Sequence, residues 1–521
     1  MCGIIGYIGD KQATPFLIDG LRRLEYRGYD SSGIAVKNGN ITVHKQMGKV
    51  AELESKLPKK VEGTCGIAHT RWATHGGVTN ANAHPHCSVD GKIALVHNGI
   101  IENARALRNR LEKEGTKLLS DTDSEALVHL IHREISNGAK PLTAVRRTLK
   151  RARGTWGICV VFEDHDMIIC ARNGSPLVIG IGEGENWIAS DTLPLQTLTQ
   201  QVILLDDGDL AVVTSDGIQT SRFDGRSTDS EVTTLDDDWG EAELGDFPHF
   251  MLKEIHDQPE ALRQCLTGRL ALKDGNARLG GLGLSSKNLQ KIPHVRLLGC
   301  GTALHASQVG RIAIEQLARV PSLAHVSSEF RHNDPVIETD ALHFAVSQSG
   351  ETADTLAAVK EIQLKGGEVR GVINVVGSTI ARQCGKGCYI HSGPEQSVAS
   401  TKAFSNMVAA LSLFAIQIGR ARSLSREKGK RLVSSLQKVP QLVEDYLANQ
   451  GPIEEVVKMV KDAKSVLFLG RGISAPVARE GALKLMEIAY IPCLAYPAGE
   501  MKHGPIALLE EGSPVIVIAP N

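Results

Sequence analysis

Cys2 is the residue of this chain whose type and position point most directly to chemistry. It follows the initiator Met1, and a small second residue permits Met1 to be removed. The new chain end would then carry a thiol and a free α-amine on one residue. An α-amine has a pKa of about 8, close enough to neutrality to accept the thiol proton, so a nucleophile and its base would lie together. The position therefore predicts a cysteine that performs acyl transfer.

Acyl transfer also needs an oxyanion hole, which is a pair of hydrogen-bond donors aimed at the oxygen of the tetrahedral intermediate. Asn98 and Gly99 fit this need, because the Asn98 side chain and the Gly99 backbone N–H supply two donors. One such donor is worth about 3 to 4 kcal/mol of barrier. We therefore predict that Asn98 and Gly99 stabilise the oxyanion.

The motifs around these residues resemble those of the class II glutamine amidotransferases. They are Cys2-Gly-Ile-Ile-Gly6, Leu24-Glu-Tyr-Arg-Gly-Tyr-Asp-Ser-Ser-Gly33, Ala68-His-Thr-Arg-Trp-Ala-Thr-His-Gly76, Asn82-Ala-His-Pro-His86 and His97-Asn-Gly-Ile-Ile-Glu-Asn103. The resemblance implies an N-terminal cysteine that hydrolyses the side-chain amide of glutamine. It also implies an α+β four-layer sandwich, in which two antiparallel sheets lie between helices.

The resemblance assigns further residues to glutamine, whose α-carboxylate favours a bidentate arginine and whose α-ammonium favours an acid. These roles fall to Arg71 and Asp123, with Thr74 and His75 lining the pocket. Trp72 matches the family's gate to an ammonia channel. Three alternatives stay open: Arg71 as a surface ion pair, Asp123 as a helix N-cap and Trp72 as a core aromatic residue. A metal at His84 and His86 is not expected, because no third ligand has suitable spacing.

The C-terminal half carries a second set of polar residues, at the ends of predicted strands. The run Ser347-Gln-Ser-Gly-Glu-Thr352 offers the side chains of Ser347, Gln348, Ser349 and Thr352, with turn N–H groups between a strand and a helix. This arrangement suits a phosphate, and the alternative is an N-capping turn. Dinucleotide binding is disfavoured, because Gly-x-Gly-x-x-Gly is interrupted by Leu304 in one copy and Ala475 in the other.

This half resembles the sugar isomerase domain, and the order of the two halves resembles the glutamine–fructose-6-phosphate aminotransferase family. The segments that carry the likeness are Ser397-Val-Ala-Ser400-Thr-Lys402, Arg479-Glu-Gly-Ala-Leu-Lys-Leu-Met-Glu487 and Ala498-Gly-Glu-Met-Lys-His503. The family's reaction converts glutamine and fructose 6-phosphate into glutamate and glucosamine 6-phosphate. Two residues depart from the family pattern: Ala303 replaces a serine and Met486 replaces a lysine.

The same resemblance assigns roles in the sugar reaction. Glu487 would move a proton between C1 and C2, and Lys484, three residues earlier on the same helical face, would orient sugar oxygens. His503 would assist ring opening from a partner subunit, which implies a homodimer. Thr302 and Ser400 would join the phosphate-binding residues.

The elements that must position these residues fall into two patterns. Residues 2–222 show short strands such as Ile41–His44, Ile93–His97, Gly157–Phe162, Met167–Ala171 and Gln201–Leu205, with helices at Thr14–Leu24 and Thr122–Ser136. Residues 223–289 are predicted to be a linker, acidic at 224–245, and connecting helices. Apolar runs that alternate with helices then predict α/β lobes with parallel sheets at 290–426 and 459–521.

An internal repeat relates the two lobes. Val295-Arg-Leu-Leu-Gly-Cys-Gly301 and Val466-Leu-Phe-Leu-Gly-Arg-Gly472 are offset by 171 residues, and the same offset relates Pro321 to Pro492. Asn521 aligns with Gly350, so the second lobe is expected to be incomplete. The repeat predicts about 80 further residues in the reading frame, where the family's Schiff-base lysine would lie.

Composition limits the remaining functions. The 521 residues carry 58 Lys+Arg and 59 Asp+Glu, a balance that argues against nucleic acid as a partner. No signal peptide or apolar run of membrane length is evident, so no membrane partner is expected. Ten cysteines without a Cys-x-x-Cys pair fit a reducing compartment, and a cytoplasmic protein is therefore expected. No cofactor is expected. Two alternatives remain: an amidophosphoribosyltransferase, which shares the N-terminal domain, and a glutaminase-only or sugar-phosphate-sensing chain.

Overall fold

The computed structural model describes residues 2–72, 76–228, 230–235 and 244–520. Two of the predicted glutamine-binding residues, Thr74 and His75, lie outside the described residues. The chain divides into two compact units, Met1–Glu241 and Ala242–Asn521, which are described separately below. All ten cysteines are free thiols.

The first unit contains two antiparallel sheets. The eight-stranded sheet has the order β14-β11-β9-β10-β1-β4-β2-β3, and the six-stranded sheet has the order β13-β12-β8-β7-β6-β5. Their strands are β1 (Gly3–Ile8), β2 (Ser31–Asn38), β3 (Asn40–Met47), β4 (Cys65–Arg71), β5 (His86–Cys87), β6 (Ile93–Ile101), β7 (Gly154–Phe162), β8 (His165–Asn173), β9 (Val178–Ile181), β10 (Asn186–Ala189), β11 (Gln201–Leu204), β12 (Asp209–Val213), β13 (Ile218–Arg222) and β14 (Val232–Thr234).

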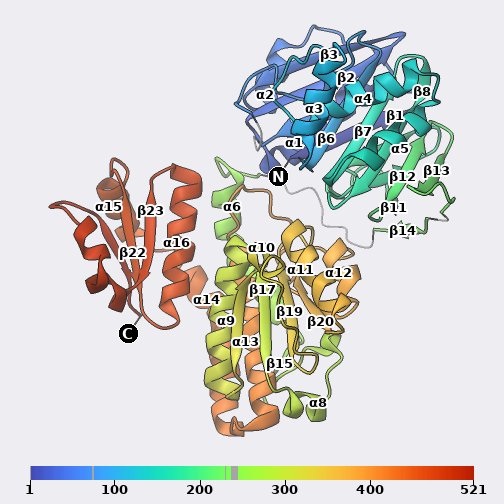
Figure 1. Cartoon of the computed structure of the whole chain (residues 1–521). Coiled ribbons are helices and arrows are strands. Elements are labelled where there is room, and N and C mark those ends of the chain that lie inside the picture. The colour runs from blue at the N-terminus through green and yellow to red at the C-terminus, as the bar shows by residue number, and fades with distance from the viewer. Residues whose placement is uncertain (1, 73–75, 229, 236–243, 521) are drawn as a thin grey trace. The chain divides into compact units, whose positions relative to one another are not determined.

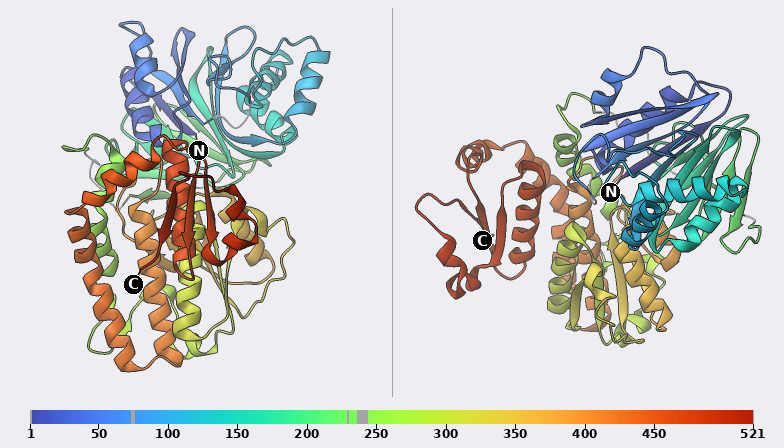
Figure 2. Two further views of the ribbon diagram at one scale, coloured as in Figure 1. Left: turned by 90° about the vertical axis from the view of Figure 1, so that its left-hand side faces the viewer. Right: turned by 45° about the horizontal axis from the view of Figure 1, so that its top comes forward.

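Helices cover the outer faces of both sheets, as Figure 2 shows. They are α1 (Ala13–Leu24), α2 (Val50–Lys56), α3 (Ala104–Lys113), α4 (Ser124–Ser136) and α5 (Pro141–Arg151). Ile4, Val96 and Cys159 belong to the core between the sheets. Leu17 of α1 and Leu127 of α4 each belong to a core between a sheet and its helices. The four-layer sandwich predicted from the motifs is confirmed, because alternating strand residues bury one face against each neighbouring layer.

The predicted strands and helices of this unit match the structure to within a few residues. One difference lies in the segment expected to be a linker, where β14 (Val232–Thr234) pairs antiparallel with β11. Thr233 faces Val202 in this pairing. Short polar strands of this kind have little hydrophobic alternation, so the sequence pattern does not reveal them.

The second unit begins with connecting elements and continues into a five-stranded parallel sheet of order β18-β17-β19-β20-β21. The elements up to the end of this sheet are α6 (Phe250–His256), α7 (Gln258–Leu266), β15 (Leu270–Ala271), β16 (Asn276–Ala277), α8 (Ser286–Lys291), β17 (Val295–Gly299), α9 (Gly301–Ala318), β18 (Ser322–Val326), α10 (Ser327–Phe330), β19 (Leu342–Ser347), α11 (Ala353–Leu364), β20 (Val369–Ile373), α12 (Thr379–Cys384) and β21 (Gly387–Tyr389).

Helices lie on both faces of this sheet (Figure 1). Residues of α9 and of α13 (Lys402–Arg422) form one core with the strands, and residues of α11 and α12 form a smaller core on the other face. α13 is the one described helix that is long and apolar enough to cross a membrane, with a mean hydropathy of 1.3. In this structure 72% of that apolar window is buried. Its apolar residues are thus accounted for by the core.

The last part of the unit repeats the first half of this sheet. It contains α14 (Arg426–Leu447), α15 (Gly451–Val460), β22 (Val466–Gly470), α16 (Ser474–Ala489), β23 (Cys493–Pro497) and β24 (Val515–Ile518), and the strand order is β23-β22-β24. This order corresponds to β18-β17-β19. Even the left-handed residues that end α9 and α16, Arg319 (φ 57°) and Tyr490 (φ 56°), are related by the 171-residue offset. The parallel-sheet lobes and their internal repeat are therefore confirmed.

Within the described residues this second sheet has three strands, against five in the first lobe. α16 covers one face through Ala478 and Ala482, which pack on Phe468. Side chains at alternating positions of the edge strands are exposed, among them Leu494, Val515 and Val517.

Candidate functional site

Cys2 lies at the start of β1, and its thiol is held by the end of β4. The Cys2 Sγ accepts a hydrogen bond from the Trp72 backbone N–H at 3.2 Å and lies 3.6 Å from the Trp72 carbonyl oxygen. Burial raises the pKa of the Cys2 thiol, while the Trp72 backbone hydrogen bond and the nearby Arg71 guanidinium lower it in part. A buried thiol needs a base close by before it attacks, and the α-amine of a processed chain end is such a base.

Asn98 and Gly99 reach this cysteine from β6, in the other sheet. The Asn98 Nδ2 donates to the Cys2 carbonyl oxygen at 3.0 Å, so the donor end of the amide faces the cysteine. Gly99 lines the same small cavity as Cys2. The structure thus brings the predicted nucleophile and the predicted oxyanion donors together.

Arg71 and Asp123 line the same cavity as Cys2 and Gly99. The Arg71 side chain is buried, and one of its nitrogens donates to the Gly77 carbonyl at 3.1 Å. Burial lowers the pKa of Arg71, and Asp123 acts against this shift. Because Arg71 is buried beside the cysteine, the alternative of a surface ion pair is wrong.

Asp123 directly precedes α4, at the position of an N-cap. Its side chain caps no backbone N–H of the helix. Instead, Oδ2 accepts from the Ile101 N–H at 2.7 Å and Oδ1 accepts from the Ser124 hydroxyl at 3.1 Å. This carboxylate lines the cavity, and a ligand ammonium is a suitable partner for it.

Trp72 completes the described part of the cavity. Its indole is 38% exposed and meets the Tyr29 ring edge to face, with 5.3 Å between the ring centroids. This exposed fraction places Trp72 outside the core, so the alternative of a core aromatic residue is wrong.

Four buried histidines lie at the cavity, and three of them, His69, His84 and His97, line it. The fourth is His86. His84 accepts from the His97 N–H at 3.2 Å through Nδ1, and His86 Nε2 lies 2.9 Å from the Thr122 hydroxyl. Burial lowers the pKa of His69 to about 3 and moves the pKa values of His84 and His86 well below the usual range. Sequence reasoning quoted these histidines within motifs and gave none of them a role.

Gly99 occupies a backbone conformation that other residues rarely adopt, with φ +131°. A Cβ at this position would lie 2.2 Å from the Thr155 carbonyl oxygen. We expect Gly99→Ala to cost about 2 to 4 kcal/mol of stability or to displace the β6 backbone and with it the oxyanion donor.

Urea unfolding and glutaminase assays of Gly99→Ala check this expectation. Gly91→Ala is the matched control, because Gly91 also has a positive φ (+74°) but has open space around its Cβ. Equal losses in the two variants would show that the Thr155 contact is unimportant.

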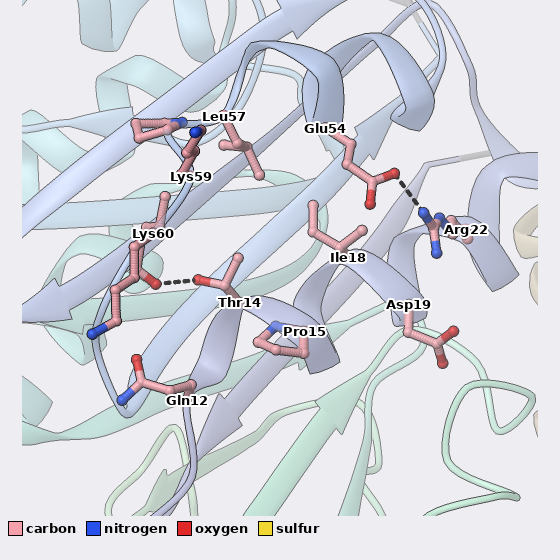
Figure 3. Close-up of a pocket in the computed structure, with 12 residues that line it drawn as sticks. Gln12, Thr14, Pro15, Ile18, Asp19, Arg22, Glu54, Leu57, Lys59 and Lys60 are labelled. Atoms are coloured by element: carbon pink, nitrogen blue, oxygen red, sulfur yellow. Dashed lines mark hydrogen bonds and ion pairs between the residues drawn. The ribbon is translucent and has the colours of Figure 1, made fainter.

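A larger cavity, of about 610 Å³, lies elsewhere in the first unit (Figure 3). It is lined by residues of α1, of α2 and of the segment that follows α2, and two pairs of its lining residues bind each other. Arg22 forms an ion pair with Glu54, and the Thr14 hydroxyl donates to the Val61 carbonyl at 2.8 Å. The larger volume of this cavity is therefore no reason to place the site here. The predicted catalytic and binding residues lie at the smaller cavity beside Cys2.

In the second unit the predicted phosphate-binding turn follows β19. The Ser347 hydroxyl lies 3.1 Å from the Thr352 hydroxyl and accepts from the Gly350 N–H at 3.0 Å. The Ser349 hydroxyl accepts from the Glu351 N–H at 3.1 Å. Thr352 makes no side-chain cap to α11, so the turn is not a simple N-cap.

Thr302 and Ser400 lie at the starts of two further helices, α9 and α13. Because β17 and β19 are parallel neighbours, the segments that follow them share one edge of the sheet, which places Thr302 and the Ser347 turn on the same side. The Ser400 hydroxyl donates to Glu395 Oε2 at 2.8 Å. The Gln348 carbonyl accepts from the Asn374 N–H at 3.3 Å, which joins the turn to the end of β20.

Lys484 and Glu487 lie on α16, which packs against α9. Lys484 Nζ donates to Glu487 Oε2 at 2.9 Å and to the Thr302 hydroxyl at 3.2 Å. The structure thus brings these three predicted residues together across the two lobes. His503 lies exposed in the segment Ala498–His503, and no hydrogen bond or ion pair joins it to Lys484 or Glu487 among the described residues.

Glu480 is a residue of this cluster that sequence reasoning missed. Its carboxylate is 5% exposed and accepts from Thr302 at 2.8 Å and from His305 at 2.7 Å, and it forms an ion pair with Lys484 at 3.4 Å. The sequence does place Glu480 four residues before Lys484, a spacing that puts both side chains on the same face of one helix. Ala303 is buried in α9 and Met486 is 42% exposed, so neither departure from the family pattern disturbs the cluster.

Comparisons with known proteins agree with both halves of the chain. A glutamine amidotransferase domain model matches residues 69–197, and a SIS domain model matches residues 288–417 and 459–521. The structure is similar to the C-terminal domain of glucosamine-fructose-6-phosphate aminotransferase from Francisella tularensis, with a TM-score of 0.51 and 35% identity over 54% of this chain and 78% of that one.

Curated relatives match along the whole sequence. Glutamine–fructose-6-phosphate aminotransferase [isomerizing] of Chlorobaculum tepidum is 49% identical over 100% of this chain and 86% of its own length. The enzyme of the same name from Thermus thermophilus is 47% identical over 100% of this chain and 85% of its own length. The chain belongs to the glutamine–fructose-6-phosphate aminotransferase (isomerizing) family.

Proposed function

We propose that this chain transfers the amide nitrogen of L-glutamine to D-fructose 6-phosphate and isomerises the product, giving L-glutamate and D-glucosamine 6-phosphate. This is the first step of amino-sugar (UDP-N-acetylglucosamine) biosynthesis. The observation that carries the proposal is the presence of both halves in one chain that is 49% identical, over its whole length, to an enzyme of that name. The match of residues 288–417 and 459–521 to the SIS domain, and the 171-residue repeat, argue against an amidophosphoribosyltransferase.

In the glutaminase half, Cys2 acts as the nucleophile. Its Sγ attacks the side-chain amide carbon of glutamine, and the thiol proton passes to the α-amine of the processed chain end. Asn98 Nδ2 and the Gly99 N–H stabilise the oxyanion, which is supported by the hydrogen bond from Asn98 to the cysteine itself. The protonated α-amine gives that proton to the amide nitrogen as the C–N bond breaks, so ammonia leaves, and water then hydrolyses the thioester to release glutamate.

Arg71 and Asp123 hold the two charged ends of glutamine in this scheme. Arg71 binds the α-carboxylate and Asp123 binds the α-ammonium, which is supported by their positions around one cavity with Cys2. Thr74 and His75, which lie outside the described residues, are proposed to bind glutamine as well. Trp72 gates the passage of ammonia, since water would protonate free ammonia before it reached the sugar.

In the isomerase half, hydroxyls and backbone N–H groups hold the phosphate. The residues are Thr302, Ser347, Gln348, Ser349, Thr352 and Ser400. Glu487 moves the proton from C1 to C2, and Lys484 orients both the sugar oxygens and that carboxylate, which is supported by the 2.9 Å contact between them. His503 assists ring opening from the partner subunit.

We further propose that the protein is a cytoplasmic homodimer. Ten free thiols are suited to a reducing compartment. His503 is exposed and makes no hydrogen bond or ion pair with its own Lys484 or Glu487 among the described residues, which fits a role in the site of a second subunit. Sedimentation of the purified chain tests the dimer, and a monomer at micromolar concentration with full activity would exclude it.

The experiment that tests the function measures glutamate and glucosamine 6-phosphate separately, in Glu487→Gln and in the parent chain. We expect Glu487→Gln to lower amino-sugar formation by about 10² to 10⁴-fold, because the proton transfer loses its base. Glutamate formation should change by less than about threefold, because the glutaminase half does not contain Glu487.

Glu455→Gln is the control, since Glu455 is an exposed carboxylate on α15. It should leave both products unchanged. If the parent chain forms glutamate but no amino sugar, the glutaminase-only alternative is correct.

A further inference from the structure

His69 and Asn98 come from different sheets of the first unit and meet between them. His69 lies on β4 and Asn98 on β6. The His69 Nε2 is 2.9 Å from the Asn98 Oδ1 and 3.1 Å from the His97 carbonyl oxygen. The imidazole is 1% exposed, and its ring stacks on His84 with 4.2 Å between the centroids.

The His97 carbonyl determines which nitrogen of His69 carries the hydrogen. A carbonyl oxygen only accepts hydrogen bonds, so Nε2 must be the protonated nitrogen. The other nitrogen, Nδ1, has no hydrogen-bond partner in the described part of the chain, as the bare nitrogen of a neutral imidazole would. The contact with Asn98 therefore runs from Nε2–H to an acceptor, and that acceptor is Oδ1.

This tautomer fixes the orientation of the Asn98 amide. With Oδ1 against His69, the amide nitrogen faces Cys2 and donates to its carbonyl oxygen at 3.0 Å. A flipped amide would set its NH₂ against the Nε2–H and its oxygen against the Cys2 carbonyl, so both contacts would become repulsive. A side chain with two nearly isosteric ends is thus held in one of its two orientations.

Burial keeps this arrangement intact at ordinary pH. Desolvation lowers the pKa of His69 to about 3, so the ring is neutral throughout the range in which glutamine is hydrolysed. A protonated ring would place a second N–H at Nδ1, where no acceptor lies among the described residues.

We propose that His69 is a positioning residue of the glutaminase site: through its Nε2–H it holds Asn98 in the orientation that presents Nδ2–H to the oxyanion. The inference rests on the proposed function, in which Asn98 is an oxyanion donor. His69 borders the cavity beside Cys2, but its imidazole is 1% exposed and its Nε2–H is engaged by Asn98 and the His97 carbonyl. His69 therefore acts through Asn98, and the charged ends of glutamine are left to Arg71 and Asp123.

Two substitutions with amide side chains of different length test the role. His69→Gln can extend an amide N–H to about the position of Nε2, whereas His69→Asn is too short to do so. We expect His69→Asn to lower the kcat of glutamine hydrolysis by about 10 to 100-fold, below the 10²- to 10³-fold loss that follows complete removal of an oxyanion donor. The KM for glutamine should change by less than about twofold, and His69→Gln should recover most of the loss.

A double-mutant cycle separates positioning from general damage to the fold. In an Asn98→Ala background the amide is gone, so adding His69→Asn should lower kcat by less than about twofold. His129→Asn is the control, because His129 is a buried histidine of the same unit and no hydrogen bond joins it to Asn98 in the described part of the chain. It should leave kcat within twofold.

The outcomes distinguish this inference from the proposed function. If the parent chain does not hydrolyse glutamine, the proposed function fails. If the parent chain is active and His69→Asn keeps its kcat, or if the His69→Asn loss is equally large with and without Asn98, the positioning role is overturned while the function stands.

Discussion

Replacing Cys2 with alanine should lower glutamine hydrolysis by about 10⁴-fold or more. The substitution removes the sulfur that we propose forms the thioester, and losses of this size or greater follow removal of a catalytic nucleophile. Binding should persist, because the groups proposed for glutamine, Arg71 and Asp123, line the cavity independently of the thiol. Glutamate release and the affinity for glutamine, measured by calorimetry, are the two readouts.

Cys87→Ala is the matched control for this substitution. Cys87 is a partly buried thiol of the same unit, in β5, and it does not line the Cys2 cavity. We expect it to keep at least half of the parent rate. Retention of more than about 1% of the rate in Cys2→Ala would mean that a different group attacks glutamine.

The second large effect concerns acid stability of the first unit. His69, His84 and His86 are buried with pKa values lowered from the usual 6.5, to about 3 for His69, because desolvation disfavours the charged ring. The unfolded chain binds a proton at each of them below pH 6.5, and the folded chain does not. Their contribution to stability is therefore complete above pH 6.5 and is lost as the pH falls below it.

The size of the loss follows from three protons. For each proton taken up on unfolding, the free energy of unfolding changes by up to about 1.4 kcal/mol per pH unit. With three histidines, we expect it to fall by about 4 kcal/mol between pH 7.5 and pH 5.5. This is a large part of the 5 to 15 kcal/mol that stabilises a typical domain. Glu125, with its pKa lowered to about 2, adds a loss of the same sign only below about pH 4.5.

Tryptophan fluorescence during urea unfolding measures this loss selectively. The four tryptophans are Trp72, Trp156, Trp187 and Trp239, so none belongs to the second unit. His86→Gln removes one of the three titrating groups and should reduce the pH dependence by about a third. Equal unfolding free energies at pH 7.5 and 5.5 would show that these histidines titrate normally in the folded chain.

Much of the fold could be predicted from the sequence, because its patterns are local. The apolar strands that end in Gly-x-Gly, and their 171-residue offset, predicted the lobes that contain β17 and β22. The short polar strand β14 was not predicted, since its pairing with β11 leaves no alternation of apolar residues. α13 has the length of a membrane span, and its burial in the second unit depends on helices far away in the sequence.

The same distinction between local patterns and distant contacts applies to the residues of the candidate sites. Residues such as Cys2 and Asn98 could be predicted because each stands in a motif whose chemistry is specific. The contact of His69 with Asn98 spans two sheets, and that of Glu480 with Thr302 spans two lobes. A sequence shows the types of such residues but not which distant partner each one meets, so their roles required the structure.

Direct nitrogen transfer is the central claim, and an isotope experiment tests it most directly. The chain is incubated with amide-¹⁵N glutamine and fructose 6-phosphate in an excess of unlabelled ammonium, and the amino sugar is analysed by mass spectrometry. We predict that glucosamine 6-phosphate carries ¹⁵N in proportion to the glutamate formed. Unlabelled amino sugar, or labelled ammonia and glutamate without any amino sugar, would contradict the proposal.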